Sequence, residues 1–229
     1  SLIQYLLNKS VTENLHLVIG DLSLDLAQKK TNNHPNATAI ALDIFDENQR
    51  KKAIQIADII ISMLPAHLHI EIAKDCVIYK KHLVTASYVS DAMKELDAAA
   101  KENNLIFMNE IGLDPGVDHM SAMKVIDEIK DKGGKMLLFE SFCGGLVAPE
   151  SDTNTWAPRN VVLAGQGGVA KFIQEGAYKY IPYCNLFRRT EFLDVEGYGR
   201  FEGYSNRDSL KYRSVYGLDD VLTLYRGTI

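Results

Sequence analysis

Two aspartates that follow apolar runs could bind the sugar of a nucleotide. Asp21 comes directly after the run LHLVIG, and Asp43 lies near the end of the run ATAIALDI. A carboxylate at the end of such a strand accepts hydrogen bonds from ribose hydroxyls and repels a 2′-phosphate. Asp21 therefore favours NAD over NADP, and Asp43 could contact the adenine. Each aspartate could instead be a helix cap or a turn residue, which is the interpretation that we prefer for Asp43.

A third apolar run, DIIISMLP, ends with Leu64 and Pro65. In a parallel nucleotide-binding sheet, the end of this strand would pass under the nicotinamide ribose. The pattern therefore predicts that both residues contact a dinucleotide cofactor. A proline that only ends a strand would give the same pattern.

The loop IGLDPGVDH carries three groups that could move protons, namely Asp114, Asp118 and His119. A buried carboxylate can have a raised pKa and act as a general base. Tyr88 and Cys143 are two further groups able to exchange a proton. For Asp118 and His119 we prefer a structural interpretation, in which they form an N-cap pair that opens the following helix.

The composition excludes several classes of function. The 229-residue chain has a formal net charge of −5 and no basic stripe, which argues against nucleic acid as a partner. Its apolar runs are too short to span a bilayer, so no membrane partner is expected. The three cysteines have no CxxC spacing, which predicts reduced thiols in a cytoplasmic protein instead of a disulfide framework or a zinc ribbon.

Three histidines, His67, His69 and His82, lie near predicted strand ends or helix starts. None has an acidic or cysteine partner at the spacing of metal ligands, so we expect no metal site and interpret all three as structural.

The candidate residues would be positioned by strands that alternate with helices. Apolar runs predict strands at residues 15–20, 37–44, 58–65, 82–90 and 105–110, and the segments between them predict helices. This alternation is typical of a parallel, doubly wound sheet that binds a nucleotide at the carboxyl ends of its strands. We therefore expect a Rossmann-like α/β domain over residues 1–118.

Residues 119–229 have a different pattern. A predicted helix over 121–134 ends at a glycine pair, residues 135–145 predict a strand, and short aromatic and β-branched segments follow. We expect an α+β domain that is rich in antiparallel strands and binds the substrate.

The opening strand and GxGxxG loop of a Rossmann domain are absent from the sequence. Residues 1–10, SLIQYLLNKS, instead have the pattern of the middle of an amphipathic helix. Asp21 lies where the ribose-binding acid falls, about 20 residues after a glycine loop. We therefore expect the first strand and the glycine loop to precede Ser1 in a longer chain.

Five segments together resemble the saccharopine dehydrogenase (saccharopine reductase) family of the L-glutamate-forming type. They are TASYVS (85–90), FMNEIGLDPGVDHMSAMKVID (107–127), SFCGGLVAPESD (141–152), YSNRDSL (204–210) and YRGT (225–228). They follow the family's order at similar spacing, and the resemblance covers essentially the whole chain. GLDPGVDH followed by CGGLVAPE is far more specific than a lone glycine motif.

The resemblance implies an enzyme of lysine metabolism. The family oxidises the secondary amine of saccharopine with NAD or NADP, and hydrolysis of the imine gives glutamate and 2-aminoadipate 6-semialdehyde. The same enzyme can run in reverse as a reductive condensation. The implied fold is a Rossmann domain followed by a substrate domain, here 119–229, whose large sheet also forms a homodimer.

The resemblance also implies roles for individual residues. Residues 113–116 match the nicotinamide end of the cleft, where we expect Leu113 and Gly116 to contact the cofactor. We favour Asp114 and Tyr88 as the catalytic residues. The segments matched to the substrate contain Ser87, Tyr88, Cys143, Gly144, Arg207, Arg226, Gly227 and Thr228.

Saccharopine carries three carboxylates, so its site needs fixed cationic groups. Arginine binds carboxylates bidentately in a way that lysine cannot. Arg207 and Arg226 fit this need, and Arg159 is a weaker candidate. An arbitrary arginine more commonly forms a surface salt bridge. The two glycines after Cys143 would let the backbone approach a ligand closely.

Two departures from the family pattern leave other functions open. The glycine loop is absent, and the segment between PESD and TWAPRN is shorter than the family usually has, so no residue can be named for the cofactor phosphates. The alternatives are a related imine-reducing dehydrogenase, such as carboxynorspermidine dehydrogenase, and a non-catalytic Rossmann regulator.

Overall fold

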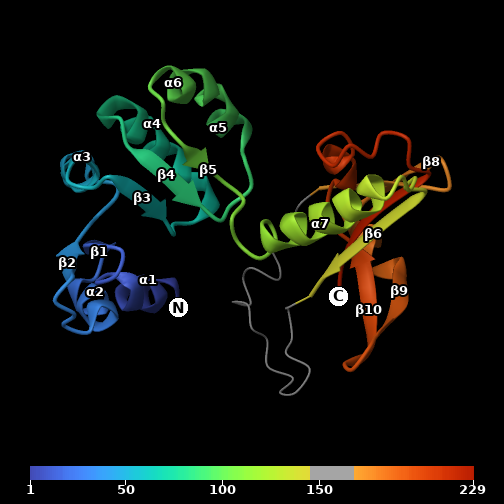
Figure 1. Ribbon diagram of the computed structural model, residues 1–229, viewed down its shortest axis with the longest axis horizontal. Coiled ribbons are helices and arrows are strands. Elements are labelled where there is room, and N and C mark those ends of the chain that lie inside the picture. Colours follow the sequence, from blue (N-terminus) through green and yellow to red (C-terminus); the bar gives the residue numbers. More distant parts are fainter. Residues whose placement is uncertain (145–167) are drawn as a thin grey trace. The chain divides into compact units, whose positions relative to one another are not determined.

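The computed structural model describes residues 1–144 and 168–229 (Figure 1). The chain divides into two compact units, Ser1–Pro115 and Gly116–Ile229. The division falls close to residue 118, where the sequence pattern changes.

The first unit consists of strands that alternate with helices, as the apolar runs predict. Its strands are β1 (Leu17–Asp21), β2 (Ala37–Ala41), β3 (Ile59–Ser62), β4 (His82–Thr85) and β5 (Phe107–Met108). Its helices are α1 (Leu2–Lys9), α2 (Leu24–Thr31), α3 (Glu47–Gln55), α4 (His69–Tyr79), α5 (Asp91–Glu95) and α6 (Asp97–Glu102), with the 3-10 turn η1 (Ala66–Leu68) before α4. The α/β prediction is therefore confirmed for this unit.

The strands of the first unit form two parallel sheets instead of the single sheet that we expected. β1 pairs with β2, and β3, β4 and β5 pair in that order. In the doubly wound order 3-2-1-4-5-6, the first strand lies between the second and the fourth. The two sheets match the two flanks of this order, and no described residue forms a strand in its first position.

Side-chain caps explain where two of these helices begin. Ser23 caps α2 by accepting a hydrogen bond from the Leu26 amide at 3.4 Å. Asp46 caps α3 by accepting from the amides of Asn48 and Gln49 at 2.9 and 3.1 Å, and the bond from Gln49 is the main cause that lowers the Asp46 pKa. Both caps satisfy amides that a helix start leaves without an intrahelical partner.

The apolar core of the first unit joins three helices to β4. Its buried members are Ile54, Ile72, Ala73, Cys76, Leu83 and Met93. Burial raises the pKa of the Cys76 thiol to about 12, so this cysteine stays protonated and unreactive.

A buried ion pair fixes α3 against α4. Arg50 Nε lies 2.7 Å from Asp75 Oδ2, and the two side chains are 12% and 6% exposed. Arg50 also donates through Nη1 to the Ile44 carbonyl at 2.7 Å. Each charge is therefore desolvated and depends on its partner.

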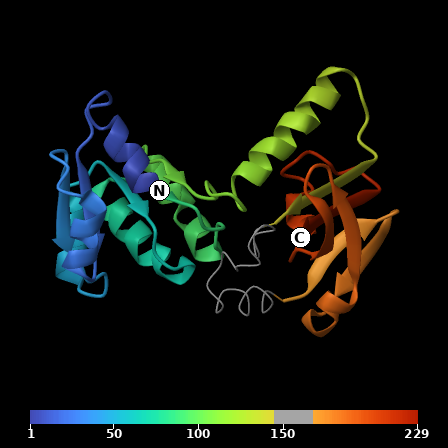
Figure 2. The ribbon, with the colours of Figure 1, turned by 90° about the horizontal axis from the view of Figure 1, so that it is seen from below.

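The second unit is an α+β domain, as predicted. It contains the helix α7 (Val117–Asp131), the 3-10 turns η2 (Tyr183–Arg188) and η3 (Ser209–Tyr212), and the strands β6 (Leu138–Cys143), β7 (Ala170–Gln174), β8 (Ala177–Ile181), β9 (Thr190–Val195), β10 (Gly199–Ser205) and β11 (Thr223–Thr228). Figure 2 shows this unit from the yellow-green helix α7 to the red strands. The helix begins at Val117 instead of Ser121.

Strand β11 is central to the sheet of the second unit. The strands follow the order β8-β7-β11-β10-β9 in antiparallel pairs, and β6 pairs with β11 in parallel. Leu224 packs with Ile126 of α7, whereas Tyr225 packs with Phe172 in a second cluster. Because side chains alternate along a strand, β11 supplies a core on each face of the sheet.

We expect Arg50→Ala to lower the free energy of unfolding by about 3–5 kcal/mol, because it leaves the Asp75 carboxylate buried without its partner. The matched control is Lys101→Ala, which breaks a pair with Asp97 whose side chains are 75% and 62% exposed. That change should lower the stability by at most about 1 kcal/mol. Urea-unfolding curves measure both losses, and equal losses would contradict the role of burial.

Candidate active site

The two residues that we favour as catalytic are hydrogen-bonded to each other in the first unit. Tyr88 follows β4 and Asp114 follows β5, and the carboxyl ends of these parallel neighbours lie at one edge of the sheet. The Tyr88 hydroxyl donates to Asp114 Oδ1 with 2.6 Å between the oxygens. A charge-assisted bond of this kind orients both groups for proton exchange.

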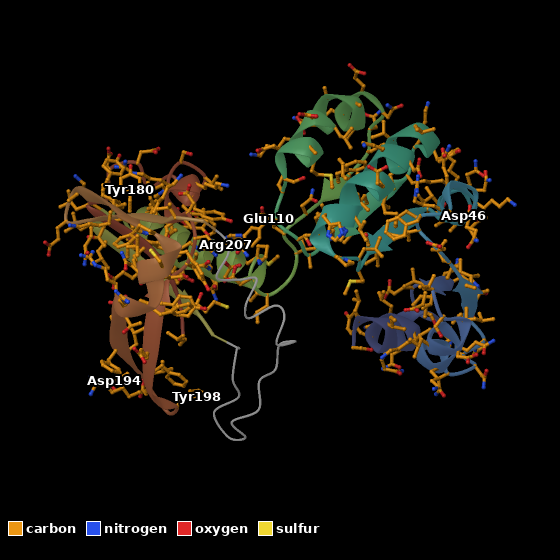
Figure 3. All side chains as sticks on the ribbon, turned by 180° about the vertical axis from the view of Figure 1, so that it is seen from behind. Asp46, Glu110, Tyr180, Asp194, Tyr198 and Arg207 are labelled. Carbon is orange, nitrogen blue, oxygen red and sulfur yellow. The ribbon has the colours of Figure 1, made fainter. Side chains whose placement is uncertain are left out.

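The loops that carry this pair are tied together through the backbone. The amide of Glu110, a residue labelled in Figure 3, donates to the Ser87 carbonyl at 3.1 Å. The Gly112 amide donates to the Pro115 carbonyl at 2.7 Å and closes the turn around Asp114. A Cβ on Gly112 would lie 3.1 Å from the Ala86 Cβ, so glycine allows the two loops to approach closely.

His69 connects Ser87 to the ends of two strands. It is the first residue of α4 and is 3% exposed. Its Nδ1 lies 2.8 Å from Ser62 Oγ at the end of β3. Its Nε2 lies 2.9 Å from Ser87 Oγ and 3.0 Å from Thr85 Oγ1 at the end of β4. These four side chains form a hydroxyl–imidazole network beside the proposed catalytic pair.

We interpreted His69 from the absence of metal-ligand spacing, which gives no information about hydroxyl partners. Ser62, Thr85 and Ser87 lie within two successive predicted strands, residues 58–65 and 82–90, and the strands of the structure end at Ser62 and Thr85. Parallel strands bring such ends together, and the histidine begins the helix between them.

Arg226 is held in the second unit by a buried ion pair. Its Nη2 lies 2.5 Å from Asp118 Oδ2, and the two side chains are 7% and 8% exposed. The guanidinium carbon also lies 4.3 Å from the centre of the Tyr212 ring, in a cation–π contact. The side chain is therefore fixed from two directions.

The expected N-cap pair of Asp118 and His119 is wrong. Helix α7 begins at Val117 with Gly116 as its N-cap residue, so both residues lie in the first turn. Asp118 Oδ1 accepts from the Gly116 amide at 2.7 Å while its other oxygen binds the arginine. His119 Nδ1 instead lies 2.6 Å from the Tyr216 hydroxyl. Arg226 of β11 decides the role of the Asp118 carboxylate. The sequence pattern around Asp118 does not indicate such a distant partner.

The segment that contains Arg207 is bonded to the backbone of Arg226. The Asn206 amide donates to the Arg226 carbonyl at 2.8 Å, and the Arg207 carbonyl accepts from the Lys171 amide at 2.8 Å. The Arg207 residue is exposed. Figure 3 shows it at the end of β10 opposite the hairpin end that Tyr198 marks. Both predicted carboxylate ligands therefore come from neighbouring segments at one end of β10.

The other predicted substrate residues of this unit gather at the ends of β6 and β11. Cys143 pairs in register with Thr228. A Cβ on Gly227 would lie 2.6 Å from the Phe142 ring, and one on Gly144 would lie 3.1 Å from the last residue of the chain. Packing within the protein therefore already requires glycine at position 227, whether or not a ligand approaches it, whereas the approach at Gly144 is only tight.

Two models of one protein family match the chain. Residues 112–229 match the saccharopine dehydrogenase C-terminal domain, and residues 1–108 match the saccharopine dehydrogenase NADP binding domain. The chain belongs to the saccharopine dehydrogenase family. The first unit is accordingly the NAD(P)-binding part of the family's architecture.

Individual saccharopine dehydrogenases and related proteins are similar over nearly the whole chain. The saccharopine dehydrogenase (NADP(+), L-glutamate-forming) of Pyricularia oryzae is 38% identical over 213 residues, which are 90% of this chain and 47% of the relative. The alpha-aminoadipic semialdehyde synthase of Arabidopsis thaliana is 36% identical over 225 residues, covering 94% of this chain and 21% of the relative. The solved apo saccharopine dehydrogenase (L-Glu forming) from Saccharomyces cerevisiae superposes with a TM-score of 0.87 at 32% identity, covering 99% of this chain and 52% of that chain. The chain thus spans about half the length of these fungal relatives.

The aspartates that we expect to bind the cofactor lie at the ends of β1 and β2 in this saccharopine dehydrogenase family member. Asp21 Oδ1 accepts from the Ser23 amide, and Asp43 Oδ1 accepts from the Phe45 amide, each at 2.9 Å. Both therefore close turns, and Ser23 is the residue that caps α2. The turns hold each carboxylate at the strand end, which is where doubly wound sheets bind nucleotides.

The apolar residues expected at the cofactor have different surroundings. Leu64 packs against the core of the first unit, and Pro65 directly precedes η1. Leu113 is 64% exposed, whereas Gly116 is buried at the start of α7.

The remaining expectations concern Arg159, metal binding, membrane helices and the cysteines. Arg159, the weaker arginine candidate, lies outside the described residues. Within residues 1–144 and 168–229, no group of three or more His, Cys, Asp or Glu side chains could hold a metal ion. None of the helices in these ranges is long and apolar enough to cross a membrane. Cys76, Cys143 and Cys184 are free thiols.

We expect His69 to make stability depend on pH. Burial, and to a lesser extent the charge of His67, lowers the pKa of His69 below its ordinary value of 6.5. The folded protein therefore binds fewer protons at this ring than the unfolded chain does. The resulting stability is fully present above pH 6.5 and is lost as the pH falls through the folded pKa.

The measurement is the free energy of urea unfolding from about pH 7.5 to about pH 5, for the unaltered protein and for His69→Gln. The variant should lose less stability over this range. Parallel profiles for the two proteins would show that the ring does not carry the effect.

Proposed function

We propose that the protein is an L-glutamate-forming saccharopine dehydrogenase, an NAD(P)-dependent oxidoreductase that acts on a CH–NH group in lysine metabolism. It oxidises saccharopine to glutamate and 2-aminoadipate 6-semialdehyde, or catalyses the reverse reductive condensation. The observation that carries the proposal is the contact between Tyr88 and Asp114 in a chain that matches both family domains.

The Tyr88–Asp114 pair suits the proton transfers of this reaction. The bound nicotinamide supplies the hydride acceptor. The substrate amine must be unprotonated before hydride leaves the neighbouring carbon, and the Asp114 carboxylate can take the proton while Tyr88 holds it in place. Once that proton has passed to solvent, the carboxylate can take a proton from the water that adds to the substrate imine. It can return this proton to the nitrogen and accept the proton of the new hydroxyl group as the carbon–nitrogen bond breaks, which releases glutamate and the aldehyde.

The arginines of the second unit supply the cationic groups that a substrate with three carboxylates needs. Arg226 is buried and oriented by Asp118 and Tyr212. Arg207 is exposed on the segment bonded to it. The remaining proposed substrate contacts are Ser87, Tyr88, Cys143, Gly144, Gly227 and Thr228.

We expect Arg207→Lys in the full-length enzyme to raise the KM for saccharopine about tenfold to a hundredfold. A bidentate contact to a charged group contributes about 1.5–3 kcal/mol, and lysine cannot reproduce it. The matched control is Arg200→Lys. Arg200 also lies in the second unit, but its guanidinium covers the Phe192 ring at 4.5 Å near the hairpin end of β10. That change should alter the KM by less than about twofold.

Steady-state kinetics with saccharopine test both the proposed function and the role of Arg207. An unaltered enzyme that does not turn over saccharopine with either nicotinamide cofactor would overturn the proposed function. An unchanged KM for Arg207→Lys would remove only this arginine from the site.

We further propose that the enzyme prefers NAD. Asp21 ends β1 shortly before α2, while Lys29 and Lys30 lie in the last turn of α2. Sites for NADP commonly place an arginine near the 2′-phosphate, whereas an acid there suits the free ribose hydroxyl. The Pyricularia oryzae relative is named for NADP(+), so this preference would distinguish the two enzymes.

We expect kcat/KM to be roughly tenfold or more higher with NAD than with NADP, a difference of about 1.4 kcal/mol. The double change Asp21→Ser and Leu22→Arg should reverse the ratio, because it replaces a repelling carboxylate by a phosphate ligand. Asp25→Ser, which alters an exposed acid in the first turn of α2, is the control and should leave the ratio unchanged. A strong NADP preference of the unaltered enzyme would refute the role of Asp21.

Two alternative functions are separated by the same assays. A related imine-reducing dehydrogenase, such as carboxynorspermidine dehydrogenase, would act on another amine with the same cofactors. A non-catalytic regulator would bind a ligand without turnover.

We also propose that the enzyme is a cytoplasmic homodimer. Tyr178 and Tyr180 of β8 and Phe192 of β9 are exposed aromatic residues on the sheet of the second unit, and they support a contact through that sheet. The three free cysteines support a reducing compartment.

A further inference from the structure

We propose that His69 is a positioning residue that fixes the Ser87 hydroxyl for contact with a polar group of the substrate. Its Nε2 lies 2.9 Å from Ser87 Oγ. The inference rests on the proposed function, because it gives Ser87 its role in binding saccharopine.

The imidazole ring is itself held firmly. Nδ1 is anchored 2.8 Å from Ser62 Oγ, and Ser62 is 5% exposed. Nε2 is also 3.0 Å from Thr85 Oγ1, and Thr85 is 2% exposed. The ring is therefore fixed by β3, by β4 and by the start of α4. A ring held in this way can fix the side chain of a loop residue that it contacts.

The backbone of Ser87 is fixed by other contacts. Its amide donates to Thr85 Oγ1 at 3.2 Å, and its carbonyl accepts from the Glu110 amide at 3.1 Å. These bonds set the position of the main chain and leave rotation about the side-chain bond. The contact with His69 selects the direction of the hydroxyl, which decides whether it meets a ligand.

The surroundings of the ring suit a neutral side chain. It is buried among three hydroxyl groups, and burial favours the uncharged imidazole. A neutral ring has one donor and one acceptor nitrogen, so the network stays intact with either tautomer. The Ser87 hydroxyl can then donate to a substrate carboxylate or accept from a substrate amine without bringing a further charge into the site.

Two substitutions test the contacts of the two ring nitrogens separately. In His69→Asn the amide falls near the position of Nδ1, so it can bind Ser62 but does not reach Ser87. In His69→Gln the amide falls near the position of Nε2, so it can bind Ser87 while the contact with Ser62 is lost. His82→Asn is the control, because His82 Nδ1 only accepts from the Ile106 amide at 3.0 Å at the start of β4.

We expect His69→Asn in the full-length enzyme to raise the KM for saccharopine about five- to tenfold, as loss of one hydrogen bond predicts, with kcat and the KM for the cofactor little changed. Ser87→Ala should produce a similar rise. Adding His69→Asn to Ser87→Ala should raise the KM no further, because both changes remove the same contact. His69→Gln should restore most of the affinity, and His82→Asn should leave all constants unchanged.

Thermal unfolding accompanies the kinetics, and Ser62→Ala replaces His69→Asn if the latter does not fold. That variant loosens the ring from its other side but keeps the contact with Ser87, so it should raise the KM in the same direction by less than His69→Asn. An unchanged KM in a folded His69→Asn enzyme, or effects of His69→Asn and Ser87→Ala that simply multiply, would overturn the role of His69 and leave the proposed function intact. No turnover of saccharopine by the unaltered enzyme would overturn both.

Discussion

The ion pair between Arg226 and Asp118 is the interaction on which the arrangement of the second unit's candidate residues depends. Both side chains are almost fully buried, so loss of either partner would leave a desolvated charge, at a cost of about 3–5 kcal/mol. The pair joins the first turn of α7 to β11, which is hydrogen-bonded to β6, β7 and β10. Because these strands are held in register, the positions of Cys143 and Thr228 follow from the sheet. Arg207 follows in the same way, since its segment continues from β10 and is bonded to the backbone of β11.

The first unit uses different electrostatics at its strand ends. The hydroxyl–imidazole network around His69 contains no ion pair, and burial favours the neutral ring. Next to it, Tyr88 and Asp114 place one carboxylate in a charge-assisted hydrogen bond. The described residues of the first unit therefore place proton-exchanging groups at the ends of parallel strands. Those of the second unit hold a buried cation on the sheet.

The parallel strands also explain why acids and hydroxyls stand at recurring points along the first half of the chain. Asp21, Asp43, Ser62 and Thr85 all lie at or near the carboxyl ends of strands, where a parallel sheet collects its functional side chains. Their chemistry differs because their neighbours differ. Asp21 and Asp43 close exposed or half-buried turns, whereas Ser62 and Thr85 are buried against one imidazole.

The sequence by itself determined the alternation of strands and helices, the change of pattern near residue 118, and the family, because these depend on local periodicity and on short motifs of consecutive residues. Those motifs also indicated Tyr88, Asp114, Arg207 and Arg226. Only the tertiary structure decided that Asp118 pairs with Arg226, 108 residues away, and that His69 contacts Ser87. It likewise showed that Gly227 is required by the Phe142 ring and that the parallel strands form two sheets. The physical reason is that a buried polar group takes its role from the partner that compensates its desolvation, and chain folding brings that partner from a distant point of the sequence.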